Sequence, residues 1–181
     1  MELLELKEKY NKAHEAYLKY KDINQTNNTE VQYLPEIIKC ISDNFPKSKV
    51  IILGDNLLNF LGVDIIIDNN NNKKQMFCDV KICQYCHDLD VIIDAYKHDS
   101  NGNWFPASDV KLNDWFIFLN AENIIFVKAD QIKIPPIEEC WFYKRDLYKT
   151  TKKANISLSK IRKKTFCRKN TSYYIKEEKF E

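Results

Sequence analysis

Two β-branched apolar runs joined by a short polar turn constrain the fold of this chain more than any other feature. The first run covers residues 62–68, the second covers residues 73–83, and Asn69 to Asn72 separate them. Short runs rich in Ile and Val are typical of strands, and the polar connection favours an antiparallel hairpin. Further strands are expected at 49–53, 89–96, 114–119 and 123–128, with Ala121-Glu122 as the tight connection between the last two.

The part of the chain before these runs has a helical period. Residues 1–21 are expected to form an amphipathic N-terminal helix, because apolar residues recur there at spacings of three and four: Leu3, Leu6, Tyr10, Ala13, Tyr17 and Tyr20. This helix either packs on its own domain or forms a dimer seam. A second helix is predicted from residue 30 to about 44, where Pro35 marks a kink or a restart.

Composition places the chain among globular proteins with a single domain. The 181 residues are 44% hydrophobic and 30% charged, which suits one domain over residues 1–181. Six cysteines are too few for a disulfide scaffold, so we expect free thiols in a reducing, cytoplasmic compartment. We expect no membrane span, because no run approaches the roughly 18 apolar residues that a span needs.

Charge is distributed unevenly along the chain. Residues 1–143 carry 15 Lys and Arg against 22 Asp and Glu, whereas the basic C-terminal segment, residues 144–169, carries 11 against 1. Clustered cations release condensed counterions when they meet a phosphate backbone, so this segment either binds nucleic acid or is a solvated face. The residues expected to contact phosphates are Lys152, Lys153, Lys160, Arg162, Lys163, Lys164, Arg168 and Lys169.

The predicted hairpin carries the residues with the clearest chemical potential. Asp64 lies near the start of its first strand, and Asp79 and Lys81 lie near the end of its second strand, on one face because side chains alternate. Two carboxylates and an ammonium would then meet at one end of the hairpin. Hard oxygen ligands of this kind hold Mg²⁺ or Mn²⁺ together with phosphate oxygens and water, and such a centre cleaves phosphodiesters.

The acid-x-Lys triplet has little specificity without this context. Four such triplets occur, at residues 5–7, 79–81, 109–111 and 177–179. The triplet at 109–111 lies in an expected loop between Pro106 and Asn113. Only the triplet at 79–81 lies in an apolar strand that follows another strand bearing an Asp, and a charge in such a strand is costly unless it is paired or metal-bound. A structural salt bridge is the alternative interpretation.

Asp64, Asp79 and Lys81 together resemble the PD-(D/E)xK nuclease superfamily, which includes type II restriction enzymes and Holliday-junction resolvases. The resemblance covers residues 30–128 and implies an α/β fold, with a restriction-endonuclease-like core in which a central mixed β-sheet is flanked by helices. It also implies a third acidic ligand on the preceding helix, for which Glu30 is the first choice and Glu36 the second. Val63 stands where the motif has Pro.

The function implied by this resemblance is a Mg²⁺-dependent (or Mn²⁺-dependent) endonuclease acting on DNA. Two alternatives stay open: a catalytically inactive nucleic-acid-binding module, and an interaction protein that uses its N-terminal helix, including as a homodimer. Cys83, Cys86 and His87 have a knuckle-like spacing for Zn²⁺, but no second closely spaced pair accompanies them, which favours buried free thiols.

Overall fold

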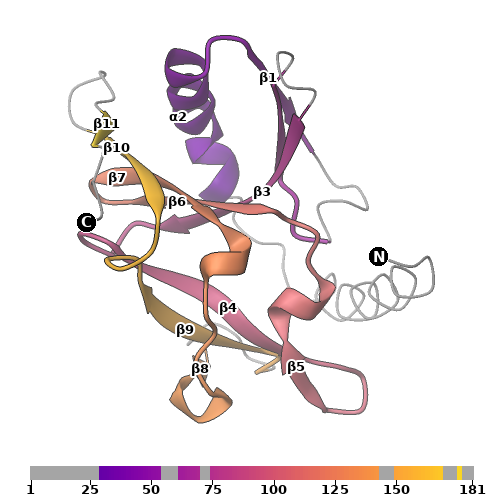
Figure 1. Ribbon diagram of the computed structural model, residues 1–181. Coiled ribbons are helices and arrows are strands. Elements are labelled where there is room, and N and C mark those ends of the chain that lie inside the picture. Colours follow the sequence, from indigo (N-terminus) through magenta and orange to yellow (C-terminus); the bar gives the residue numbers. More distant parts are fainter. Residues whose placement is uncertain (1–28, 54–60, 70–73, 143–148, 169–174, 177–181) are drawn as a thin grey trace.

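The computed structural model describes residues 29–53, 61–69, 74–142, 149–168 and 175–176, and the side chains of residues 29–31 and 175–176 are not described. The predicted N-terminal helix at residues 1–21 lies outside these ranges. Within them, strands predominate (Figure 1).

The larger sheet, sheet A, has seven strands in the order β1-β2-β3-β6-β7-β10-β11. The predicted strands and hairpin are confirmed here: β2 pairs with β3 in antiparallel fashion, and β6 and β7 flank Ala121-Glu122. In contrast to these antiparallel neighbours, β3 and β6 run parallel. The strands of sheet A are β1 (Ser48–Ile52), β2 (Ile65–Asn69), β3 (Lys74–Cys83), β6 (Trp115–Asn120), β7 (Asn123–Lys128), β10 (Lys163–Cys167) and β11 (Ile175–Lys176).

The smaller sheet, sheet B, has four antiparallel strands in the order β5-β4-β9-β8. These strands are β4 (Asp90–His98), β5 (Trp104–Pro106), β8 (Trp141–Phe142) and β9 (Thr151–Ser157). Short 3₁₀ turns lie on the connections between the two sheets: η1 (Ala107–Val110) between β5 and β6, and η2 (Ala129–Gln131) and η3 (Ile137–Glu139) between β7 and β8. The register of β4 with β9 shifts between Asp94 and Tyr96, which marks a bulge. The basic C-terminal segment therefore contributes one strand to each sheet, β9 and β10.

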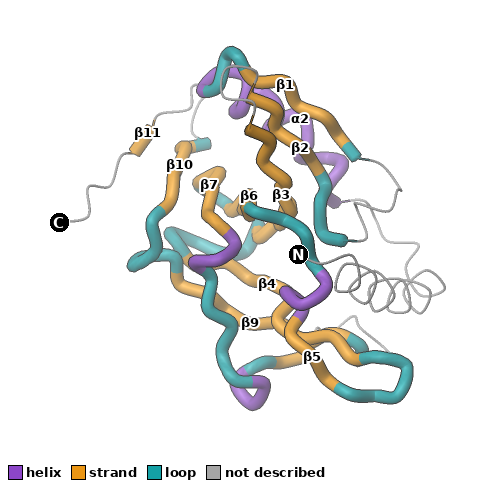
Figure 2. Tube along the Cα trace, turned by 45° about the vertical axis from the view of Figure 1, so that its right-hand side comes forward, coloured by secondary structure: helices purple, strands orange, loops and turns teal. Residues whose placement is uncertain are grey.

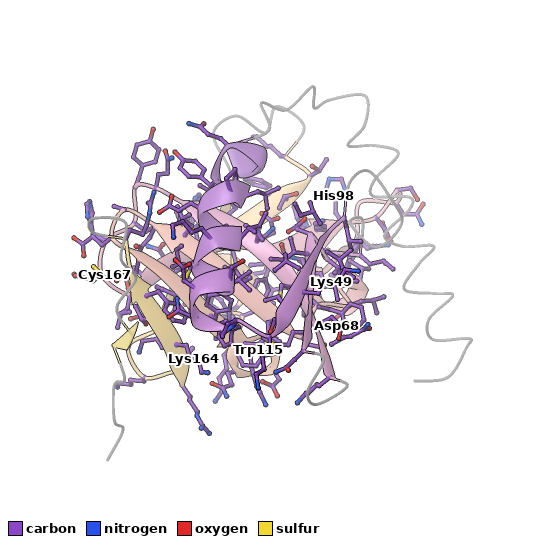
Figure 3. The ribbon with its side chains drawn as sticks, turned by 90° about the horizontal axis from the view of Figure 1, so that it is seen from above. Lys49, Asp68, His98, Trp115, Lys164 and Cys167 are labelled. Carbon is purple, nitrogen blue, oxygen red and sulfur yellow. The ribbon has the colours of Figure 1, made fainter. Side chains whose placement is uncertain are left out.

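One α-helix, α2 (Thr29–Asn44), lies among the described residues and continues through Pro35. Seen from above in Figure 3, α2 crosses sheet A between β10, marked by Lys164 and Cys167, and β1 and β2, marked by Lys49 and Asp68. Its buried side chains Ile37, Cys40 and Ile41 pack on the face of sheet A that carries Cys78 and Val80. In the described part of the chain, no helix is long and apolar enough for a membrane span.

Sheet B packs on the opposite face of sheet A, so the molecule has a helix, a sheet and a second sheet in successive layers (Figure 2). The core between the two sheets is built from side chains of alternate residues, including Phe116, Phe118 and Ile125 from sheet A and Val91 and Ile93 from sheet B. Strands β4 and β9 supply this face because their buried residues alternate with more exposed ones.

The predicted α/β class is wrong: the fold is rich in β-structure, with two sheets and, among the described residues, a single α-helix. A parallel pair such as β3 and β6 needs a crossover connection, which is usually helical. Here the crossover contains β4, β5 and η1 instead. The β-branched alternation of residues 90–97 favours a strand, so a sheet covers the face where a restriction-like core would place a helix.

Candidate active site

Antiparallel pairing of β2 with β3 brings Asp64, Asp79 and Lys81 to one end of the hairpin. Ile65 is opposite Cys78 in this register, so Asp64, one residue earlier, falls opposite Asp79. The backbone N–H of Val80 donates to Asp64 Oδ2 at 2.6 Å, which holds the Asp64 carboxylate against β3. Asp79 and Lys81 share the face of β3 that points toward sheet B, because the alternate residues Cys78 and Val80 face α2.

The Asp79 carboxylate is buried between two lysines. Lys81 Nζ lies 2.6 Å from Asp79 Oδ1, and Lys111 Nζ lies 2.5 Å from Asp79 Oδ2. The side chain of Asp79 is 1% exposed, that of Lys111 is 9% exposed and that of Lys81 is 21% exposed. A carboxylate this deeply buried must have its charge compensated, and each of its oxygens has an ammonium partner. Lys81 retains access to solvent.

Lys111 follows η1 directly and is held at Asp79 by the segment before β2. The backbone N–H of Leu112 donates to the Leu61 carbonyl at 2.8 Å. Gly62 has a φ of +75°, and a Cβ there would lie 3.1 Å from Lys111 Cγ and 3.5 Å from Asp79 Oδ2. Glycine therefore permits both the left-handed backbone and the close approach of the lysine.

Lys111 is not predicted from the sequence as a site residue. It ends the triplet Asp109-Val110-Lys111, which lies in a loop and carries no strand context. Its pairing with Asp79 spans 32 positions and depends on how η1 packs beside the hairpin. A lysine in a loop gives no local indication of such a distant partner.

Sheet B adds charged residues to this centre. Lys153 on β9 lies 3.4 Å from Asp94 Oδ1 on β4. Lys97, also on β4, interacts electrostatically with Asp94, Asp79, Lys81 and Lys111. We refer to Lys81, Lys97, Lys111 and Lys153 as the lysine cluster. The cluster places four lysines beside Asp79 and Asp94 where the two sheets meet, and Asp64 lies opposite Asp79 on the neighbouring strand.

This arrangement changes the pKa values of its members. Burial by itself raises the pKa of the Asp79 carboxyl, but Lys111 and Lys81 outweigh burial and hold that pKa below its ordinary value. Asp94 behaves in the same way: burial opposes ionisation, and the lysine cluster lowers its pKa. The pKa of Lys97 is lowered, first by burial and then by Lys111 and Lys81, against the opposing effect of Asp94. Lysines gathered in one place in this way attract an anion.

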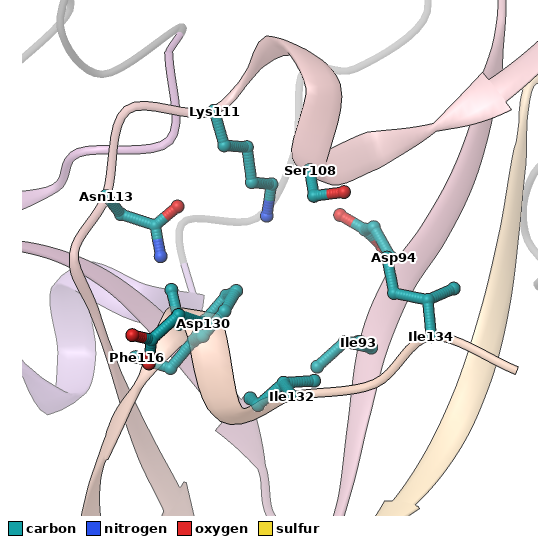
Figure 4. Close-up of a pocket in the computed structure, with 10 residues that line it drawn as sticks. Ile93, Asp94, Ser108, Lys111, Asn113, Phe116, Asp130, Ile132 and Ile134 are labelled. Atoms are coloured by element: carbon teal, nitrogen blue, oxygen red, sulfur yellow. The ribbon is translucent and has the colours of Figure 1, made fainter.

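A pocket of about 220 Å³ opens beside the cluster (Figure 4). Lys111 and Asp94 belong to both, so the pocket adjoins the Asp79 carboxylate through Lys111. The remaining lining combines apolar and polar side chains from β4, η1, the connection from η1 to β6, β6 itself and the segment after β7: Ile93, Ser108, Asn113, Phe116, Ala129, Asp130, Ile132 and Ile134.

The resemblance implies a third acidic ligand on the helix before the hairpin. Of the two candidates, Glu36 is described, and it does not lie at the Asp79 centre. Glu36 forms a bidentate pair with Arg168, with Nε to Oε1 at 2.7 Å and Nη2 to Oε2 at 2.9 Å. The side chain of Glu30 lies outside the described part of the chain. Helix α2 itself packs on the face of sheet A opposite to Asp79 and Lys81.

The basic residues predicted to bind nucleic acid have different environments. Lys153 belongs to the lysine cluster, and Arg168 also donates to the Asn120 carbonyl in addition to pairing with Glu36. Lys152 Nζ lies 5.5 Å from the Trp104 ring centroid and 5.3 Å from that of Phe142. Three of the basic residues are exposed on the connection from β9 to β10 or at the start of β10: Lys160, Arg162 and Lys164. Lys163 is half-buried, and Lys169 lies outside the described residues.

The cysteines are free thiols, and all except Cys167 are buried. Cys83 Sγ contacts the backbone of Ile92, and burial raises the pKa of the Cys83 thiol to about 11, so it stays protonated. Among the described residues, no group of three or more His, Cys, Asp or Glu side chains is arranged to hold a metal ion. The Cys83 and Cys86 pair therefore contributes to the core between the sheets.

Comparison of the chain with protein-family models, with curated proteins and with solved structures finds no match.

Proposed function

We propose that this chain is a metal-dependent endonuclease that hydrolyses DNA phosphodiester bonds at the centre formed by Asp64, Asp79 and Lys81. The observation that carries this proposal is the buried Asp79 carboxylate held between Lys81 and Lys111, with Asp64 opposite it on the neighbouring strand. The same three residues carry the resemblance to the PD-(D/E)xK nucleases, although the surrounding fold is rich in β-structure.

The lysines supply the electrostatic part of the proposed reaction. A phosphodiester bears one negative charge, and Lys81 and Lys111 place ammonium groups where they can pair with it. As water attacks phosphorus, further negative charge develops on the phosphoryl oxygens, and preorganised cations in a water-poor site stabilise it. Lys81 is the more exposed of the two partners of Asp79 and is the one we assign to the phosphate.

Asp64 and Asp79 would hold the divalent cation. Their oxygens are the hard donors that Mg²⁺ accepts alongside phosphate oxygens and water, so the donor chemistry fits. Because both Asp79 oxygens carry a lysine ammonium, a cation that binds Asp79 has to displace Lys81 or Lys111 from one of them. When bound, such an ion lowers the pKa of its water and neutralises phosphate charge.

The experiment is a cleavage assay on plasmid and branched DNA, with Mg²⁺ or Mn²⁺ and with EDTA. Wild type should cleave only with the divalent ion, and Lys81→Met should lose at least about a hundredfold in rate, as is typical when a charge-stabilising donor is removed. Asp109→Asn, an exposed change near Lys111 that leaves the cluster intact, is the matched control and should cleave like wild type. Cleavage by Lys81→Met at the wild-type rate would contradict the proposal.

A nucleic-acid-binding module without catalysis is the second candidate. It is favoured by the 1% exposure of Asp79 and by the pairing of both its oxygens, which are also properties of a structural ion-pair network. In that case wild type binds DNA but cleaves none of the substrates with either metal, and Lys81→Met weakens binding only.

A further inference from the structure

The pocket beside the lysine cluster has the composition of a site for a flat, partly polar ring. The ring of Phe116 forms part of its wall and stacks on Phe118, with ring centroids 5.4 Å apart and planes at 19°, so an aromatic surface faces the pocket. Ile93 and Ile132 lie along the lower side in Figure 4, the Lys111 side chain points into the pocket from above, and that of Asn113 points in from the left. Apolar walls with a few polar groups are typical of small-molecule sites.

The size of the pocket restricts what can enter it. A volume of about 220 Å³ lies below the roughly 300–1,000 Å³ of pockets that hold drug-sized ligands. A single ring system suits this space. Ser108, Asn113 and Asp130 place a hydroxyl, an amide and a carboxylate on the lining, so ring nitrogens and exocyclic groups would find hydrogen-bonding partners there.

Lys111 connects this pocket to the phosphate-binding part of the site. Its ammonium lies 2.5 Å from Asp79 Oδ2, 5.2 Å from the centroid of the Phe116 ring, and on the pocket lining. A ligand with an anionic group and an aromatic ring could place the anionic group at the lysine cluster and the ring in the pocket. A nucleotide has this combination.

We propose that the pocket receives the base of an unpaired nucleotide whose phosphate lies at Lys81 and Lys111. This inference rests on the proposed function, because it takes the lysine cluster as the phosphate site. A base inside a duplex is stacked and paired, so it reaches a pocket only after extrusion or in a single strand. The substrate class is therefore single-stranded DNA or DNA with unpaired nucleotides, such as a flap, a bulge or a branch point.

A second hollow supports a strand passing this point. It shares Asn113, Ala129 and Asp130 with the pocket and is also lined by Lys74, Lys128 and Trp115. Lys128 Nζ lies 5.8 Å from the centroid of the Trp115 ring. Gln75 and the carboxylates of Asp114 and Asp130 also line this hollow, so the part of it suited to a single strand is the Trp115 ring with Lys74 and Lys128, which can contact a base and the backbone.

The test uses a single-stranded oligonucleotide with one 2-aminopurine, titrated with the full chain in EDTA. Binding should change the fluorescence of 2-aminopurine, and an oligonucleotide with an abasic site in its place should bind at least tenfold more weakly. Ser108→Tyr, an exposed lining residue of η1 whose enlarged side chain fills the pocket, should weaken binding of the 2-aminopurine strand at least tenfold. Asp109→Tyr, its exposed neighbour outside the lining, should bind like wild type.

Equal binding of the abasic and the intact strand, or equal effects of Ser108→Tyr and Asp109→Tyr, would overturn the base pocket. The cleavage assay keeps the two proposals apart. If the base-dependent binding is observed but no DNA is cleaved with Mg²⁺ or Mn²⁺, the pocket stands and hydrolysis fails. If DNA is cleaved and Ser108→Tyr cleaves single strands at the wild-type rate, hydrolysis stands and the pocket fails.

Discussion

A carboxylate with 1% exposure destabilises a protein unless its charge is compensated, and Asp79 is compensated twice, by Lys81 and Lys111. Lys111→Met removes one of these cations while keeping an apolar stem of similar length. We expect a loss of about 1–3 kcal/mol in the free energy of unfolding, the range for a buried polar group deprived of a partner. Urea denaturation measures it.

The matched control for this variant is Lys39→Met. Lys39 pairs with Asp43 at 2.6 Å, but the two side chains are 54% and 44% exposed, so this pair lies in water. Exposed pairs contribute less than about 1 kcal/mol. If Lys111→Met and Lys39→Met lose the same free energy of unfolding, the buried pair with Asp79 contributes no more to stability than an exposed pair.

The pH dependence of stability follows from Asp94. Its pKa is lowered in the folded chain, so its contribution is present above the unfolded pKa of about 3.9 and is lost as the pH falls toward the folded pKa. Asp94→Asn should therefore be less stable than wild type at pH 6, and the difference should shrink as the pH is lowered to 3. Urea denaturation at both pH values checks this, and a difference that stays constant would contradict it.

At the scale of elements, the turn before β2 determines where Lys111 lies. Gly62 and Gly102 both have positive φ, +75° and +83°, but an added Cβ meets Lys111 Cγ and Cδ at 3.1 and 3.2 Å in the first case and nothing within 4 Å in the second. An added Cβ at Gly62 would therefore displace the stem of the lysine that pairs with Asp79 by a few tenths of an ångström.

Gly62→Ala should therefore destabilise the chain more than Gly102→Ala does. The shared backbone strain costs about 1–2 kcal/mol in each variant, and the crowding of Lys111 adds to it only in Gly62→Ala. Thermal unfolding of both variants measures the difference. If the two melting temperatures fall equally, the close approach at Gly62 has no energetic effect.

The local sequence pattern predicts which segments form strands better than it predicts which strands lie next to one another. The hairpin of β2 and β3 follows from residues adjacent in sequence: β-branched runs and an Asn-rich turn. The strand at 90–98 is also visible in its alternation, but nothing in those residues states that β4 joins a separate sheet with β9, more than 50 positions later. The predicted fold class is wrong for this reason, since the covering of a sheet face is decided by distant segments.

The same distinction separates the residues of the site. Asp64, Asp79 and Lys81 lie within one hairpin, so alternation and register are enough to place them together. Lys111, Asp94, Lys97 and Lys153 reach the centre only through the packing of sheet B and η1 on sheet A. No periodicity in the sequence records that packing.

At the scale of the whole molecule, the proposed function predicts that the exposed cations between β9 and the start of β10 contribute to DNA affinity. Replacing Lys160, Arg162 and Lys164 together by Gln should weaken binding at low salt and make the slope of log affinity against log salt shallower by about 2 to 3, since each lost phosphate contact contributes about 0.9. Fluorescence anisotropy at several salt concentrations measures this slope.

The control is a triple change with the same loss of charge at exposed lysines elsewhere, Lys39, Lys47 and Lys133. This control tests whether the loss of three positive charges by itself makes the salt dependence of binding shallower. Equal slopes for the two triple variants would contradict a specific role of the connection from β9 to β10 in the proposed binding of DNA.

The parallel junction of β3 with β6 has a consequence for synthesis on the ribosome. The hairpin that bears Asp79 emerges before Lys111, and β6, the next neighbour of β3 in sheet A, comes later still. Until then we expect the Asp79 carboxylate to stay hydrated, because enclosing it without its second cation would be unfavourable. Closure of the charged centre should accordingly be a late event in the maturation of the nascent chain, and a truncated product ending before residue 111 should leave Asp79 in water.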